Sequence, residues 1–195
     1  MNRHTLVSRQ AVQRTSWDRL RWFSPHSPGI TQPDAQWHDW LMNPSSLTRR
    51  LQQASHNRFR VEQLSQHIVK PALNEANLLR MHSQQYALVR QVLLYGGDQP
   101  WVFARTVVPL PTLNAGNRHL LKLGNRSLGS VLFKYPHIRR APIEICHAER
   151  SAGFFTDFVW GRRSIFEIHQ APLLVTELFL DTFCQSQQLK PLMAK

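Results

Sequence analysis

Residues 86–110, YALVRQVLLYGGDQPWVFARTVVPL, decide the fold of this chain. Residues 86–95 and residues 101–110 are apolar and rich in β-branched side chains, and each segment has the length of a strand. Between them stands GGDQP, which consists largely of residues that tight turns require. The stretch therefore predicts a β-hairpin, and with it an antiparallel sheet.

The segments around the hairpin predict helices before it and further strands after it. Apolar spacing within residues 35–42 predicts a helix, and a second short helix follows with Ser45 or Ser46 as its cap. The first third of the chain is therefore expected to be mostly helical. After the hairpin, we expect a helix over residues 127–135 and strands over residues 143–147, 158–169 and 173–180.

Helices followed by strands that short turns connect are typical of an α+β domain with an antiparallel sheet. No G-x-G-x-x-G motif follows a predicted strand, which argues against a doubly wound nucleotide-binding fold. A length of 195 residues suits one domain with a single core. We expect residues 17–185 to form that domain, between a basic N-terminal tail over residues 1–16 and a C-terminal tail over residues 186–195.

The chain is strongly basic. It has 24 Lys and Arg residues against 12 Asp and Glu residues, which gives a net charge of +12. Such a surplus attracts anions, and nucleic acid, a membrane surface and a small acidic metabolite all qualify. No apolar run approaches the roughly 20 residues that cross a bilayer, so we expect no stable membrane insertion. The two cysteines are too few for a disulfide framework, which favours a reducing, cytoplasmic location.

Two charged residues stand inside strands that otherwise look buried. Arg90 shares one face of its predicted strand with apolar neighbours, and Glu177 lies within LLVTELFL, the most apolar strand of the chain. An unpaired charge in such surroundings costs several kcal/mol, roughly, so each needs a partner or a ligand. Three interpretations are open: the two residues form a structural ion pair, either points into solvent, or both face a cavity and bind opposite ends of a small polar ligand.

Other side chains give weaker signals. Arg105, Arg162 and Arg163 also lie in predicted strands, and pairing with acids is the simplest role for each. The ten histidines show no metal-binding spacing, so neither a metal site nor a cofactor is predicted. No nucleic-acid-binding motif is present and the aromatic residues fall where a core needs them, so we expect no nucleic acid partner.

Several longer motifs occur together between residues 36 and 180. They are HDWLM at 38–42, RQVLL at 90–94 with the following GGDQPW, ARTVVP at 104–109, LG at 123–124 and 128–129, IEI at 143–145, WGRRS at 160–164, and PLLVTELFL at 172–180. In these motifs and their order the chain resembles the chorismate pyruvate-lyase family. ARTVVP, WGRRS and PLLVTELFL are specific in combination, whereas any one of them alone is weak.

The resemblance implies a sheet of about six antiparallel strands with helices packed around it and a buried cavity under flap-like helices. It implies that Arg90 binds a ring carboxylate, that Leu128 and Leu47 contribute through their backbones, and that Glu177 lies near a ring hydroxyl. The implied reaction is the conversion of chorismate to 4-hydroxybenzoate and pyruvate in ubiquinone synthesis, with no cofactor. The implied protein is a cytoplasmic monomer that is inhibited by its product.

The chain departs from the family pattern in four places. Leu47 stands where the family often has methionine. Ala104 stands where the family has glycine, residues 148–159 form a longer insert, and residues 63–84, where we look for part of the flap, match poorly. The alternative function is a non-catalytic domain that binds small aromatic acids as an effector sensor. Such a sensor would need the arginine but has no need for Glu177.

Overall fold

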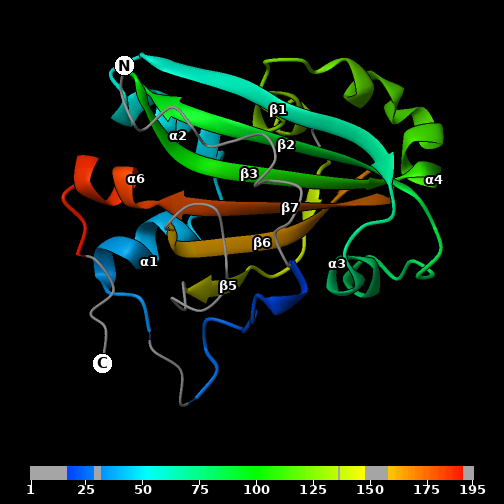
Figure 1. Ribbon diagram of the computed structural model, residues 1–195, viewed down its shortest axis with the longest axis horizontal. Helices are drawn as coiled ribbons and strands as arrows, with labels where there is room; N and C mark the ends of the chain where they lie inside the picture. The colour runs from blue at the N-terminus through cyan, green and yellow to red at the C-terminus, as the bar shows by residue number, and fades with distance from the viewer. Residues whose placement is uncertain (1–16, 29–31, 136, 148–157, 191–195) are drawn as a thin grey trace.

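One antiparallel sheet runs through the computed structural model, which describes residues 17–28, 32–135, 137–147 and 158–190 (Figure 1). The described strands are β1 Phe59–Val69, β2 Ala87–Gly96, β3 Gln99–Pro109, β4 Arg139–Arg140, β5 Glu144–His147, β6 Phe158–Ile168 and β7 Ala171–Leu180. Their order is β1-β2-β3-β7-β6, and β4 and β5 follow one another along the outer edge of β6. The sheet is therefore six strands across, and the expected α+β fold is confirmed.

The predicted hairpin is confirmed as β2 and β3. Its register pairs Arg90 with Thr106 and Gly96 with Gln99. Gly97 in the turn has a φ of 61°, a left-handed conformation that glycine adopts without steric cost. A side chain at Gly96 would collide with the Trp101 indole, so the turn needs both glycines.

The expectation that the first third is mostly helical is wrong, because β1 occupies residues 59–69. This strand pairs with β2 at the edge of the sheet. Its sequence, FRVEQLSQHIV, is largely polar, and most of its side chains are half-buried or exposed. An edge strand has one free side, so it lacks the apolar run that identified the central strands.

The helices are short and lie between or beside the strands. The predicted first two helices are confirmed, since Asp34 caps α1 by accepting from the Trp37 amide at 2.9 Å and Ser46 caps α2 by accepting from the Arg49 amide. The described helices are α1 Ala35–Met42, α2 Leu47–Ala54, α3 Leu73–Leu78, α4 Leu110–Thr112, α5 Gly129–Leu132 and α6 Asp181–Ser186, with one-turn segments η3 Trp17–Arg19, η4 Leu113–Asn117 and η5 Arg118–Lys122. The fifth helix is thus shorter than the expected 127–135.

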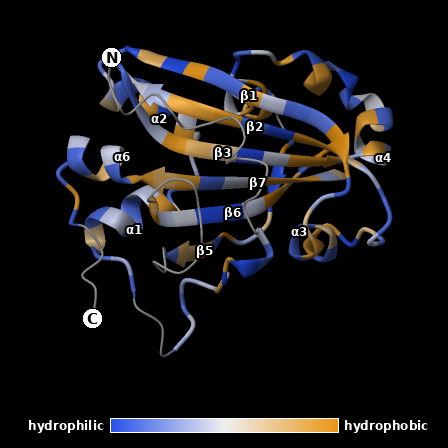
Figure 2. Ribbon diagram, in the orientation of Figure 1, coloured by the Kyte–Doolittle hydropathy of each residue, from blue (hydrophilic) through white to orange (hydrophobic). Residues whose placement is uncertain are grey.

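Both faces of the sheet are covered. Helices α1, α2, α5 and α6 pack on one face, where the buried residues form two apolar clusters side by side. On the other face, η3 and the segment around α3 cover two smaller clusters. Hydrophilic segments interrupt the apolar central strands (Figure 2), and because side chains alternate between faces, each buried charge belongs to one face only.

Arg105 lies on the face that α3 covers and is paired there. Its guanidinium donates to both oxygens of Glu75, from Nε at 2.7 Å and from Nη2 at 2.9 Å. Glu75 also accepts from the Ala72 amide at the start of α3, and the Arg105 guanidinium lies 4.7 Å from the Trp17 ring centroid. This buried, two-pronged ion pair fixes α3 on the sheet, the structural role that the sequence favoured.

The two ends of the chain are only partly described. Residues 1–16 and 191–195 lie outside the described part, so the domain boundaries remain a prediction. Within the expected C-terminal tail, Leu189 is buried and the Lys190 carbonyl accepts from the Trp37 indole at 2.9 Å. Among the described residues, no helix is long and apolar enough to cross a membrane.

The Glu75–Arg105 pair yields a stability prediction. Glu75→Gln leaves a buried guanidinium without its counter-charge, so we expect the free energy of unfolding to fall by about 3–5 kcal/mol, measured by urea denaturation. Asp39→Asn is the matched control, because Asp39 is exposed and its ion pair with Arg50 should contribute less than about 1 kcal/mol. Equal effects of the two substitutions would contradict a structural role for the buried pair.

Candidate active site

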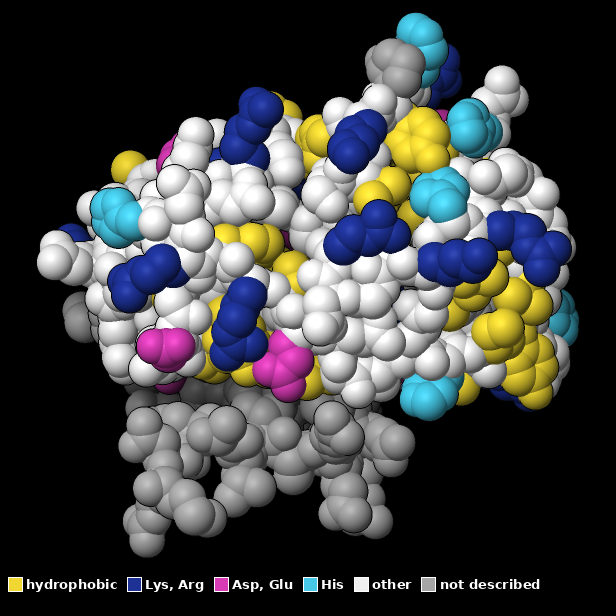
Figure 3. Space-filling view, turned by 90° about the horizontal axis from the view of Figure 1, so that it is seen from above, with side chains coloured by type: hydrophobic (Ala, Val, Ile, Leu, Met, Phe, Trp, Pro, Cys, Tyr) yellow, Lys and Arg dark blue, Asp and Glu magenta, His cyan; other side chains and the backbone are white. Residues whose placement is uncertain are grey.

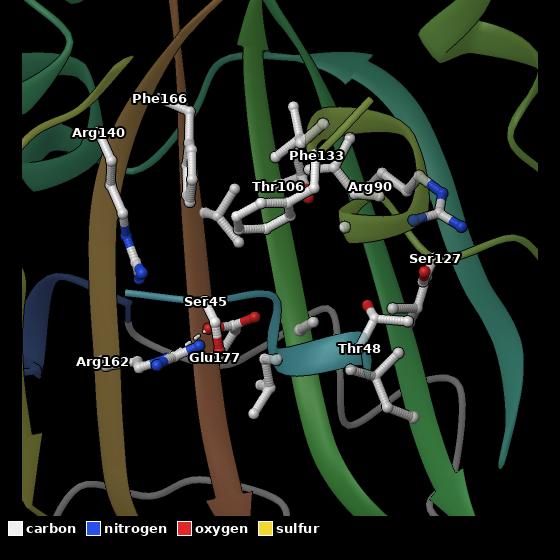
Figure 4. A pocket seen from close by; sticks show the side chains of 18 residues that line it. Ser45, Thr48, Arg90, Thr106, Ser127, Phe133, Arg140, Arg162, Phe166 and Glu177 are labelled. Carbon is white, nitrogen blue, oxygen red and sulfur yellow. Dashed lines mark hydrogen bonds and ion pairs between the residues drawn. The ribbon is translucent and has the colours of Figure 1, made fainter. Parts of the chain in front are cut away.

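A pocket lies on the face of the sheet that α2 and α5 cover, at the seam between the two larger apolar clusters (Figure 4). Strands β2, β3, β7 and β6 form its floor, and the starts of α2 and α5 form its cover. Its lining residues are Ser45, Leu47, Thr48, Arg90, Val92, Leu94, Ala104, Thr106, Ser127, Leu128, Gly129, Leu132, Phe133, Arg140, Arg162, Phe166, Val175 and Glu177. All four residues that the sequence put forward for the site are among them.

Arg90 lines the pocket and has no acidic partner within the described part of the chain. The residue is only 3% exposed, and its Nη2 donates to the backbone carbonyls of Gly124 and Arg126 at 2.6 and 2.9 Å. Its Nε is buried and has no hydrogen-bond partner among the described residues. Burial lowers the pKa of Arg90 from 12.5 to about 10, so it stays a cation at neutral pH. Such a group is well suited to bind an anion.

Glu177 lies across the pocket and is paired with Arg162. The Arg162 Nε donates to Glu177 Oε2 at 2.6 Å, while its Nη1 donates to the carbonyls of Trp40 and Leu41 at 3.0 and 3.1 Å. The Glu177 side chain keeps 15% of its surface exposed toward the pocket, against 3% for Arg162. The carboxylate therefore has one oxygen in an ion pair and a face available to a ligand.

The interpretation of Arg90 and Glu177 as an ion pair is wrong, because each has other partners. The strand register places Arg90 opposite Thr106, Thr106 opposite Val175, and Glu177 two residues beyond Val175. Strand and residue spacings then put the two Cα atoms about 12 Å apart. Figure 4 shows the Arg90 guanidinium at the end of the pocket opposite Glu177 and directed away from it, toward the carbonyls that it binds. The two residues therefore mark opposite ends of the pocket.

Two helix starts meet above the pocket. Leu47 is the first residue of α2, and Leu128 immediately precedes α5, whose first turn Ser127 caps by accepting from the Ser130 amide at 3.1 Å. The two starts touch so closely that a Cβ on Gly129 would lie 2.6 Å from Thr48 Oγ1. First-turn amides have no partner within their own helix, so both starts can present donors to the pocket.

The family model for chorismate lyase matches residues 13–188 of this chain. The chain belongs to the chorismate lyase family. A probable chorismate pyruvate-lyase of Marinobacter nauticus is 42% identical over 149 residues, which are 75% of this chain and 77% of that protein. A probable chorismate pyruvate-lyase of Chromohalobacter salexigens is 39% identical over 148 residues, which are 74% of this chain and 80% of that protein.

Among solved structures, the chain is loosely similar to the C-terminal domain of the histidine utilization repressor from Pseudomonas syringae. The TM-score is 0.48 at 11% identity, over 70% of this chain and 99% of that chain. A likeness at this level has no bearing on function.

The cover of the pocket in this chorismate lyase family member differs from the expectation. None of residues 63–84 lines the pocket; they form the end of β1, helix α3 and the segments around them. The cover comes instead from residues 45–48 and 127–133. Residues 148–157, most of the insert, lie outside the described part, whereas Phe158 and Val159 are buried in β6.

The other arginines in the strands lie on two different faces of the sheet. Arg105 and Arg163 lie on the face away from the pocket, where they pair with Glu75 and Glu144. Arg162, the neighbour of Arg163, faces the pocket because side chains alternate along β6. Arg140 also lines the pocket, although its place in the sequence did not single it out. Its two-residue strand offers no apolar pattern that would have identified it.

The contact between the two helix starts gives a prediction about the cover. Gly129→Ala should destabilise the fold by about 1–3 kcal/mol, because the new methyl group collides with Thr48 Oγ1. Thr48→Ala removes that oxygen. The double variant should therefore lose less unfolding free energy than the sum of the losses in the two single variants. A double-mutant cycle of urea denaturation measures this coupling, and simple additivity would show that the two helix starts do not press on each other.

Proposed function

We propose that this protein is a chorismate lyase that converts chorismate to 4-hydroxybenzoate and pyruvate. The observation that carries the proposal is the buried Arg90 guanidinium, which has no acidic partner among the described residues and lies across one pocket from Glu177. The named relatives support the same reaction. A sensor domain would need the arginine, but it gains nothing from a carboxylate at the other end of the pocket.

Arg90 binds the ring carboxylate in this proposal. Its unpartnered Nε is the donor that a carboxylate oxygen would satisfy, and hydrogen bonds between two charged groups are the strongest of their kind. The backbone amides at Leu128 and Leu47 add neutral donors from the helix starts. At the far end, a carboxylate already held in an ion pair accepts hydrogen bonds, so Glu177 accepts one from the ring hydroxyl.

The reaction breaks one carbon–oxygen bond and needs no outside reagent. The electron pair of the ether bond leaves with the oxygen of the enolpyruvyl group, and the hydrogen on the neighbouring, hydroxyl-bearing carbon is lost as the ring becomes aromatic. The departing group is the enolate of pyruvate, and it becomes pyruvate by taking up one proton at its methylene carbon, which balances the proton lost from the ring. Aromatisation supplies the driving force, so we propose that no cofactor takes part. The protein holds the reactive conformer in a dry site with donors fixed in place.

Two routes for the ring hydrogen fit the pocket. In one, Glu177 accepts it as a proton; in the other, it passes within the substrate to the methylene carbon of the leaving group, and Glu177 only orients the ring. The Arg162 Nε donates a hydrogen bond to Glu177 Oε2, so the carboxylate is already used as an acceptor, and this favours an acceptor role over a donor role. Replacement of Glu177 by the amide distinguishes the routes, because an amide can orient the hydroxyl but cannot take the proton.

The charge of the whole chain suits a small dianionic substrate. Lys and Arg side chains are scattered over the face drawn in Figure 3, where acidic side chains are few, and the whole chain has a net charge of +12. Such a field speeds the encounter with an anionic substrate and weakens as salt is added. We further propose a cytoplasmic monomer in ubiquinone synthesis whose covered pocket releases its aromatic product slowly.

The decisive test is turnover of chorismate by the purified protein without added metal or cofactor, with 4-hydroxybenzoate and pyruvate measured together. We expect equimolar products from the wild type. Arg90→Gln should lower kcat/KM for chorismate by about 100-fold, because it removes the buried charge. It should weaken the binding of 4-hydroxybenzoate by a similar factor. Glu177→Gln should lower kcat about 100-fold or more if Glu177 accepts the proton, and much less if it only orients the ring.

Asp98→Asn, at the exposed tip of the β2–β3 hairpin, is the control and should behave as the wild type. Melting temperatures show whether each variant is folded. A wild-type protein that binds 4-hydroxybenzoate but forms none from chorismate would refute the lyase and favour the sensor.

A further inference from the structure

Arg140 projects into the pocket from the far edge of the sheet and is held in one orientation. It belongs to β4, where it pairs with Phe166 of β6. Its Nε donates to Ser164 Oγ at 2.7 Å, and its guanidinium lies 4.9 Å from the Phe166 ring centroid. Figure 4 shows the guanidinium directed toward Arg162 and Glu177, on the side of the pocket opposite Arg90. A side chain fixed in this way keeps its outer nitrogens aimed at the pocket.

Those outer nitrogens have no acidic partner among the described residues. The five ion pairs in the described part of the chain do not include Arg140, and its one hydrogen bond there uses Nε. Arg162 already neutralises Glu177, so Arg140 leaves this end of the pocket with an excess positive charge. Burial, and next the positive charge of Arg162, lower the pKa of Arg140 to about 10, which leaves it a cation at neutral pH.

We propose that Arg140 binds the second carboxylate of the substrate, the one on the departing enolpyruvyl group. This inference rests on the proposed function. In chorismate the hydroxyl stands para to the ring carboxylate, and the ether oxygen is on the carbon next to the hydroxyl. If Arg90 holds the ring carboxylate and Glu177 the hydroxyl, the enolpyruvyl group must therefore leave the ring close to Glu177. Arg140 is the cation with free donors at that end.

The same contact assists bond breaking. As the ether bond breaks, its electron pair moves onto the enolpyruvyl oxygen, and the negative charge of that group grows. A fixed cation beside the group stabilises this change without any movement of the protein. Arg140 neither gains nor loses a proton, because the ring hydrogen balances the charge. The aromatic product lacks the enolpyruvyl group, so Arg140 interacts with the substrate and the leaving group but not with 4-hydroxybenzoate.

The test compares substrate with product in Arg140→Gln. Glutamine keeps a donor for Ser164 but removes the charge. We expect kcat/KM for chorismate to fall by about 10- to 100-fold, the usual effect of losing a charged hydrogen bond. The Kd of 4-hydroxybenzoate, from equilibrium titration, should change less than about threefold. Arg140→Lys keeps the charge and should recover part of the lost kcat/KM.

Two comparison variants make the outcome specific. Arg139→Gln removes an exposed charge from the neighbouring position and should leave both constants unchanged. Arg90→Gln should weaken the binding of both chorismate and 4-hydroxybenzoate. If Arg140→Gln weakens the binding of both ligands equally, or leaves the binding and turnover of chorismate unchanged, Arg140 does not bind the second carboxylate. The Kd of chorismate is also measured by direct titration, so the two ligands can be compared even if the wild type does not turn chorismate over. An absence of turnover would refute the lyase function separately.

Discussion

The pocket depends on the hydrogen bonds of Arg162, because this one side chain joins the sheet to the helices above it. Its Nε holds Glu177 on β7, and its Nη1 donates to the Trp40 and Leu41 carbonyls in the last turn of α1. Last-turn carbonyls have no partner within their helix, and the helix dipole favours a cation there. Because α2 begins a few residues after α1, Arg162 also determines where the Leu47 helix start lies over the pocket.

Side chains alternate between the two faces along each strand, so neighbouring residues have different roles. Arg162 faces the pocket while Arg163 pairs with Glu144 on the opposite face, and Ala104 lines the pocket while Arg105 pairs with Glu75. Charges that hold α3 and the outer strands in place are thus separated from the ligand-binding charges by the thickness of the sheet. A shift of one residue in the register of β3 or β6 would exchange the two sets, so the register of the sheet determines the pocket.

This arrangement explains which features could be predicted from the sequence. Arg90 and Glu177 stood out because a charge within a long apolar strand needs a partner or a ligand, and the hairpin was clear because its turn residues and strands agree. Strand β1 was missed because an edge strand can be polar. Arg140 was missed because a two-residue strand has no pattern, and Arg162 could not be distinguished from Arg163 until the packing showed which face holds the pocket.

The described residues that line the pocket give it an excess of positive charge. Of the described residues that line it, three are arginines and one is a glutamate, a net charge of +2. Burial lowers the pKa of both Arg90 and Arg140, which means that their charged forms are held against a desolvation penalty. A dianion offsets that penalty and a monoanion offsets half of it. On the proposed function, this difference favours substrate over product by electrostatics, and it opposes the slow product release that we propose for the covered pocket.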